Sequence, residues 1–208
     1  MYHLENKMKK TLKKFYSFYQ TDSQSRECAS AFLSHSSISN VNDFDFETQI
    51  KEHYDSVSLK FHLVKLTIES DGISVTDDLS GVEQLWMDWI PNQFAWPMFS
   101  EKLKSLIVDS LLPHQKTHWI KCEVTHKEEC RFYYIPVYEF VDDVLDLEKT
   151  EFVDDTDLIL DPVFKQDVID KLEFFYMPFK YGFERDLYVS DKVKYMLLKN
   201  GISGVSFD

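Results

Sequence analysis

The clearest pattern of hydrophobic and polar residues lies in residues 187–207, which read LYVSDKVKYMLLKNGISGVSF. The first three are aliphatic or aromatic and suit a short strand, and Ser190 follows where a helix N-cap is expected. Val193, Met196 and Leu197 have the spacing of one apolar helical face. The Asn-Gly pair after them is typical of a helix end. The pattern predicts a strand, a capped helix, a glycine turn and a second strand.

A second stretch, residues 98–106 (MFSEKLKSL), repeats the pattern of residues 188–196 (YVSDKVKYM). Serine, an acidic residue and two lysines occupy the same places in both stretches. Two interpretations are open: the stretches are copies of one unit, or each is simply a helix with a serine cap and lysines on its solvent face. Both interpretations predict a helix after Ser100 and another after Ser190.

Alternation with a period of two predicts strands elsewhere. Residues 59–68 and 73–76 flank an Asp-Gly turn and predict a hairpin. Residues 119–124 and 131–137 flank a polar turn and predict another, whereas the Ser-, Asn- and Asp-rich residues 21–45 predict helix fragments and loops. Helices and strands mix without a regular strand–helix–strand rhythm. We therefore expect an α+β fold with a mixed, largely antiparallel sheet and flanking helices.

The middle of the chain contains the expected boundary between two regions. Aromatic residues crowd between Val82 and Phe99, and Pro97 stands near the end of this cluster. We predict an N-terminal α+β region over residues 1–95 and a C-terminal α+β region over residues 96–208. The two regions either fold separately or form one compact unit.

Composition narrows the class of protein. Hydrophobic residues make up 44% of the chain and aromatic residues 15%, which is typical of a globular protein. The formal net charge of −13 disfavours direct binding to nucleic acid or to an anionic membrane. Three cysteines without a CxxC pair are typical of a reducing compartment. No apolar run is long enough to span a bilayer or to serve as a signal peptide. We expect a cytoplasmic protein.

Motifs that carry chemistry are weak. Four zinc-competent side chains are spaced four apart: His118, Cys122, His126 and Cys130. In a hairpin centred near His126 only the two cysteines would face each other. The DDVLD of residues 142–146 matches a magnesium-binding DDxxD pattern, but no second acidic motif accompanies it. We predict no catalytic residues, no metal ligands and no cofactor, and keep a small metal-dependent hydrolase as an alternative function.

Negative charge is concentrated between residues 137 and 173. There 13 acidic residues oppose 3 lysines, so 13 minus 3 gives −10 of the net charge of −13. Hydrophobic residues interleave with the acids, which predicts a folded surface. Such a surface attracts and orients a cationic partner protein, and aromatic residues anchor many interfaces. The residues that we assign to this contact are Asp142, Asp143, Asp146, Glu148, Glu151, Asp154, Asp155, Asp157, Trp86 and Trp89.

Four motifs follow one another in the second half of the chain: MFSEKLKSL, a strand ending in YYIPV, the acidic DDVLDLEKTEF, and LYVSDKVKYMLLKNGISGVSF. In this order they resemble the C-terminal region of a bacterial immunity-protein family of polymorphic toxin systems, formerly a domain of unknown function. In that family a Val-Asp-Ala-Leu-Asp-like segment precedes the ending (F/Y)VS-x-x-hK…GhxGhxF, where h is hydrophobic. The matching positions are Val141, Asp142, Val144, Leu145, Asp146, Tyr188, Val189, Ser190, Val193, Lys194, Gly201, Gly204 and Phe207.

The resemblance covers about residues 96–207 and implies a function. Members of the family are thought to neutralise a cognate toxin by binding it, and the family supplies no catalytic residues. The resemblance therefore implies a cytoplasmic, non-enzymatic protein that occludes the active site or substrate groove of a toxin. A general adaptor or regulatory binding protein is the second alternative.

Overall fold

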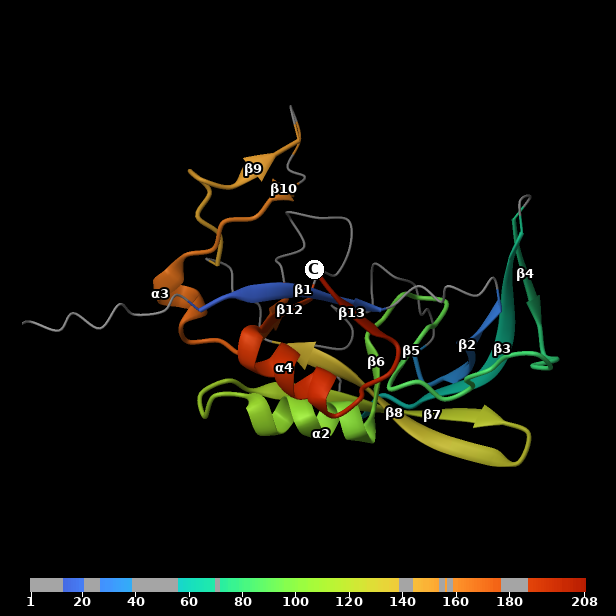
Figure 1. Cartoon of the computed structure of the whole chain (residues 1–208). Helices are drawn as coiled ribbons and strands as arrows, with labels where there is room; N and C mark the ends of the chain where they lie inside the picture. The colour runs from blue at the N-terminus through green and yellow to red at the C-terminus, as the bar shows by residue number, and fades with distance from the viewer. Residues whose placement is uncertain are drawn as a thin grey trace, which may run out of the picture.

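The computed structural model describes residues 13–20, 27–38, 56–69, 72–138, 144–153, 156, 159–176 and 187–208. In these ranges the chain forms strands and short helices (Figure 1). Their order is β1 (Phe15–Gln20), β2 (Glu27–Ser36), β3 (Leu59–Glu69), β4 (Gly72–Thr76), β5 (Trp89–Ile90), β6 (Met98–Ser100), α2 (Glu101–Ser110), β7 (Thr117–His126), β8 (Glu129–Tyr138), β9 (Glu151–Phe152), β10 (Ile159–Asp161), α3 (Gln166–Ile169), β11 (Phe174–Tyr176), β12 (Leu187–Ser190), α4 (Asp191–Lys199) and β13 (Val205–Phe207).

The larger sheet has the strand order β2-β3-β7-β8-β6-β5, and β4 pairs with β3 at one side. Both predicted hairpins are confirmed, as β3–β4 and as β7–β8. Among the strands of the described ranges, β3 and β7 pair in parallel and the other pairs are antiparallel. The fold is therefore α+β, rich in sheet and with few helices.

The smaller sheet has the order β11-β12-β1-β13, so the first strand lies between two strands from the end of the chain. Backbone bonds continue this pairing beyond β13, because Ser17 N–H donates to Asp208 O at 2.9 Å and Asp208 N–H donates back at 3.2 Å. The larger sheet and the smaller sheet each contain strands that precede Pro97 and strands that follow it. The predicted boundary between residues 95 and 96 thus does not separate one sheet from another.

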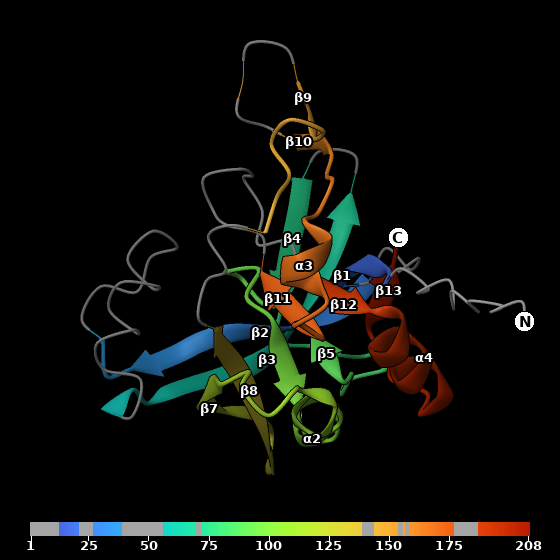
Figure 2. The same cartoon turned by 90° about the vertical axis from the view of Figure 1, so that its left-hand side faces the viewer.

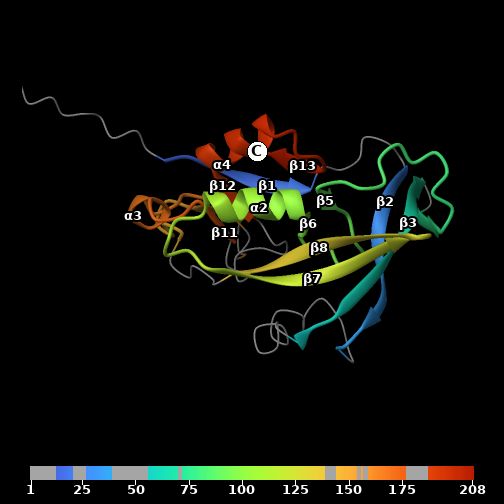
Figure 3. The ribbon, with the colours of Figure 1, turned by 90° about the horizontal axis from the view of Figure 1, so that it is seen from below.

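The two similar sequence stretches fold into similar units. In each, a strand ends at a serine whose Oγ accepts the amide of the third helical residue: Leu103 N–H lies 3.1 Å from Ser100 Oγ, and Val193 N–H lies 3.3 Å from Ser190 Oγ. The strand–helix–turn–strand prediction for residues 187–207 is confirmed. Helices α2 and α4 pack against each other, as Figure 3 shows.

The likeness extends to residues outside the repeated stretches. An acid stands just before each partner strand, Asp88 before β5 and Glu173 before β11. The carbonyl of each acid accepts the amide of the capping serine, at 2.7 Å for Asp88 and 2.9 Å for Glu173. Each carboxylate accepts the serine hydroxyl and lies 3.9 Å from a lysine Nζ. Simple helix capping accounts for the serines but not for the matching acids.

Two of the three apolar clusters among the described residues belong to the two sheets and their helices. The first lines one face of the larger sheet and includes Phe61, Trp96 and Ile135. The second joins α2, α4 and the smaller sheet: Phe18, Trp89, Phe99, Leu103, Ile107, Phe174, Leu187, Val189, Val193 and Leu197. Because this second cluster combines residues of β5 and β6 with residues of β1, β11 and β12, it connects the two sheets.

The expectation of helix fragments and loops over residues 21–45 is wrong for β2. This strand pairs along most of its length with β3. Its inward residues Ala29 and Ala31 are fully buried under the first cluster. Small side chains fit where the sheet meets the residues after β5, but they carry little of the β-branched signal by which strands are recognised.

Candidate protein-binding surface

An arm built from residues 144–153 and 159–161 projects from the molecule (Figures 1 and 2). We call these residues the acidic arm. Its two short strands pair antiparallel, with Phe152 opposite Ile159 and Glu151 opposite Asp161. The arm is the described part of the acidic stretch that the sequence assigns to partner binding.

The base of the arm is fixed to the body. Val144 and Leu145 are buried beside Phe175 and Tyr188 in a third apolar cluster. Backbone bonds join the arm to the segment after β10: Asp146 N–H donates to Val163 O at 2.7 Å, and Lys165 N–H donates to Val144 O at 2.9 Å.

A threonine closes the turn that follows. Thr150 is 7% exposed, and its Oγ1 lies 2.9 Å from Asp146 O and 3.3 Å from Val163 O. The same oxygen accepts the amide of Val163 at 3.1 Å. Since one hydroxyl connects both sides of the arm, the turn is held by specific bonds as well as by packing.

The carboxylates of the arm differ in their surroundings. Asp146 accepts a hydrogen bond from Lys149, which lowers the pKa of the Asp146 carboxyl. Glu148, Glu151 and Asp161 are exposed. Glu148 interacts electrostatically with Lys149, whose hydrogen bond goes to Asp146. These three carboxylates are thus available to a cationic partner.

Apolar side chains lie among these acids. Leu147, Val153 and Leu160 are 51%, 42% and 67% exposed. Exposed apolar residues beside exposed charges are a combination found in protein interfaces, where apolar contact adds to electrostatic attraction.

The structure places the assigned residues unequally. Asp146, Glu148 and Glu151 belong to the acidic arm. The other five assigned acids lie outside the described residues: Asp142, Asp143, Asp154, Asp155 and Asp157.

Neither assigned tryptophan lies on the arm, and one is not a surface residue. Trp89 is 6% exposed and packs with Phe18 and Phe99 at ring-centroid distances of 5.0 and 4.9 Å. Its assignment as an anchor is therefore wrong, because aromatic crowding in the sequence reflected the core. Trp86 is partly buried and donates from Nε1 to Glu129 at 3.0 Å.

The cysteines do not face each other as the sequence predicted. Cys122 lies opposite Tyr133, and Cys130 opposite Thr125, because the turn falls at residues 127–128 and not at His126. Burial raises the pKa of the Cys122 thiol. Within the described ranges, no three His, Cys, Asp or Glu side chains are grouped closely enough to hold a metal ion.

A serine, a histidine and an aspartate do meet on β2, β3 and the residue after β4. Ser34 Oγ lies 2.7 Å from His62 Nδ1, and Asp77 Oδ1 lies 3.9 Å from His62 Nε2. The Asp77 side chain is 89% exposed. In catalytic triads the aspartate is buried, so that it fixes the imidazole and stabilises its charged form. This exposed cluster does not provide that setting.

A second exposed surface was missed by sequence reasoning. All five residues of β4 are exposed, and Ile73 and Val75 are 67% and 48% accessible. Ile68 on β3, opposite Ile73, is 54% accessible. The alternation in residues 73–76 predicted the strand, but alternation alone does not tell which face of a strand is covered.

Comparison with known proteins does not assign the chain to a family. The chain matches no protein-family model, and no curated protein is significantly similar to it. Among the helices of the described residues, none has the length and hydropathy needed to cross a membrane.

Proposed function

We propose that the chain is a cytoplasmic, non-enzymatic immunity protein that binds a cationic toxin domain through the acidic arm and occludes its active site or substrate groove. The order of motifs in residues 96–207 supports the class of function. The observation that carries the choice of surface is the exposure of Glu148, Glu151 and Asp161 among exposed apolar side chains on an arm fixed to the core.

Two physical effects favour this surface. Clustered negative charge raises the rate of encounter with a cationic protein, by up to several orders of magnitude at low salt. The bonds of Thr150 and the burial of Val144 hold the base of the arm in place before binding. A surface that is already ordered loses less conformational entropy when the complex forms.

The first test is a growth assay. Genes adjoining this one are expressed inducibly in a sensitive bacterium, with and without this protein. We expect one neighbour to stop growth, this protein to restore it, and the two proteins to co-purify. If no neighbour is toxic, or if rescue occurs without a complex, the proposed function is wrong.

The second test concerns the surface and uses the toxin domain that the growth assay identifies. The variant E148K/E151K reverses two exposed charges on the arm. A matched control, D109K/D191K, makes the same change in net charge at exposed residues of α2 and α4.

We expect E148K/E151K to lower the association rate at low salt by about tenfold or more, and to flatten its salt dependence. The control should change the rate only by about twofold, because distant charges are screened. Equal effects of the two variants would show that net charge, and not the acidic arm, governs binding.

A further inference from the structure

Among the described strands, β4 pairs with β3 alone and so forms an open edge of the larger sheet. All five of its residues are exposed. Its sequence, GISVT, contains no charged residue and no proline, the residues with which proteins commonly protect an edge from pairing. An edge of this kind is a template for a further strand.

The register shows which backbone groups face outward. Glu69 and Gly72 close a hairpin with two residues between them, and such a closing pair exchanges both backbone hydrogen bonds. Bonded pairs recur at every second position, so Ser74 bonds to β3. The N–H and C=O groups of Ile73 and Val75 therefore point away from β3, toward the open edge.

The side chains of the same two residues form an apolar face. Ile73 lies opposite Ile68, and Val75 opposite Leu66. In a non-bonded antiparallel pair the side chains are close together and on one face of the sheet. The edge thus offers both backbone hydrogen bonds and apolar contacts to one extended segment.

The charges around the edge indicate what kind of segment fits. Asp77 and Asp78 follow β4 directly, and the Asp77 side chain is 89% exposed. Hydrogen bonds from Ser80 lower the pKa of Asp78, and Lys65 and Lys127 nearby lower it further, so this carboxyl stays ionised. Lys or Arg residues flanking an apolar strand would complement these acids. A second copy of this chain would instead bring together two molecules that each carry a charge of −13.

The position of β4 relates it to the acidic arm. In Figure 1 the β3–β4 hairpin and the arm both point upward, from opposite ends of the molecule. A partner that contacts both must therefore extend across the molecule, whereas a smaller partner would use one of the two surfaces.

We propose that β4 accepts an extended, apolar segment of the toxin domain, flanked by Lys or Arg, as an additional strand of the larger sheet. This inference rests on the proposed function and specifies how the partner is recognised. The outward N–H and C=O groups of Ile73 and Val75 bond to the segment, while Asp77 and Asp78 attract its basic flanks.

Amide hydrogen exchange tests the backbone contact directly. The probe is the toxin domain identified by the growth assay, added to the whole immunity protein. We expect the amides of Ile73 and Val75 to exchange at least about tenfold more slowly in the complex, because they become hydrogen-bonded. The amide of Ser74, already bonded to β3, should change little. A complex that leaves Ile73 and Val75 unprotected would overturn the inference while leaving the proposed function intact.

A pair of variants separates the backbone bond from the side chain. V75P removes an outward N–H, and proline is tolerated on an edge strand where that group faces solvent. V75T keeps the N–H and the β-branched shape. We expect V75P to weaken binding of the toxin domain by about tenfold or more and V75T by much less. Melting temperatures near that of the original protein confirm that both variants fold.

Two results would contradict the proposal. If V75P binds the toxin domain as tightly as V75T does, no strand is added at β4. If sedimentation shows that the free protein is a dimer, and its Ile73 and Val75 amides are protected before toxin is added, the occupant is a second copy of this chain.

Discussion

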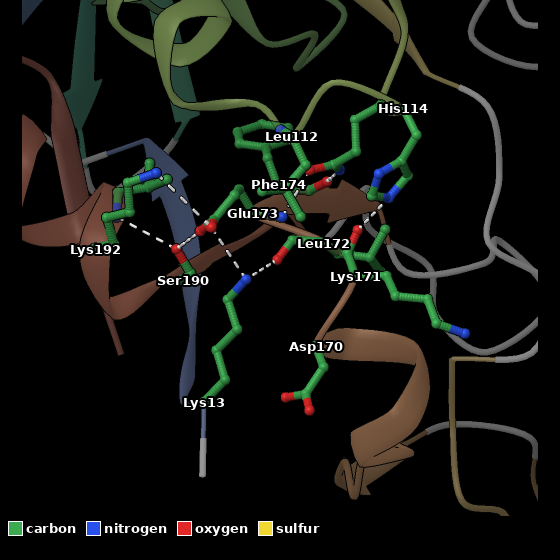
Figure 4. A network of polar contacts seen from close by, with 12 residues as sticks. Lys13, Leu112, His114, Asp170, Lys171, Leu172, Glu173, Phe174, Ser190 and Lys192 are labelled. Atoms are coloured by element: carbon green, nitrogen blue, oxygen red, sulfur yellow. Dashed lines mark hydrogen bonds and ion pairs between the residues drawn. The ribbon is translucent and has the colours of Figure 1, made fainter. Parts of the chain in front are cut away.

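Ser100 and Ser190 each combine two roles in a single hydroxyl group. Each accepts the amide of the third residue of a helix and donates to a carboxylate that stands just before the neighbouring strand. The surroundings differ, since Ser190 is fully buried and Ser100 is partly exposed. Figure 4 shows Ser190, Lys13 and Lys192 directed at Glu173, which is itself 5% exposed.

Replacing these serines should therefore have unequal costs. We expect Ser190→Ala to lower the free energy of unfolding by about 2–3 kcal/mol, because a cap is lost and one oxygen of a buried carboxylate loses its hydroxyl donor, although the ion pairs of Glu173 with Lys13 and Lys192 remain. Ser100→Ala should cost about 1 kcal/mol, since Asp88 keeps its bonds to Ser203. Urea unfolding measures both values. Equal losses would mean that burial of the carboxylate does not matter.

For single residues, the sequence predicts hydrogen-bond partners that are close along the chain and misses those that are remote. Both serine caps follow from their place before an apolar helical face. Their carboxylate partners, Asp88 and Glu173, are 12 and 17 positions away, with other segments between. Nothing in the local pattern distinguishes these two acids from the many that remain in water.

Among the elements, the turn between α4 and β13 shows how closely two segments meet. Gly204 has φ +77°, and a Cβ added there would overlap the carbonyl oxygen of Trp89. Gly201 has φ +58°, but a Cβ there would meet nothing within 4 Å. Both positions favour glycine for conformational reasons, and only Gly204 also needs it for space.

Alanine substitution distinguishes these two requirements. Gly201→Ala should cost about 1 kcal/mol of stability, the strain of a left-handed conformation. Gly204→Ala should cost about 3 kcal/mol, because the backbone of β5 must also move. Thermal or urea unfolding of the two variants gives the comparison. A smaller loss for Gly204→Ala would show that this turn does not pack tightly on β5.

Elements with local signals were predicted well. The β3–β4 and β7–β8 hairpins are marked by turn residues between alternating strands, and both formed as expected. The strand over residues 27–36 was not predicted, because its register is set by β3, more than twenty residues away in sequence. The charge of the acidic arm was also visible in the sequence. The exposure of Ile73 and the burial of Trp89 were not, since they depend on which elements pack nearby.

For the whole molecule, the sharing of sheets across Pro97 predicts joint folding. Residues 1–95 expressed alone would contain β1–β5 without the strands that pair with β1 and β5, and residues 96–208 would lack β1 and β3. We expect each fragment alone to show poorly dispersed amide NMR spectra, and the full chain to unfold in one cooperative transition. A well-dispersed spectrum from either fragment would show that it folds on its own.

The pairing of β1 with β12 and β13 also determines when the smaller sheet can form during translation. The ribosome produces β1 early, but its partner β12 begins only at Leu187. At about 5–20 residues per second, the interval is roughly ten to thirty seconds. During that interval Phe18, later buried under four other aromatic rings, has none of its final neighbours from the end of the chain. A nascent chain halted before Leu187 would expose this strand to chaperones and proteases.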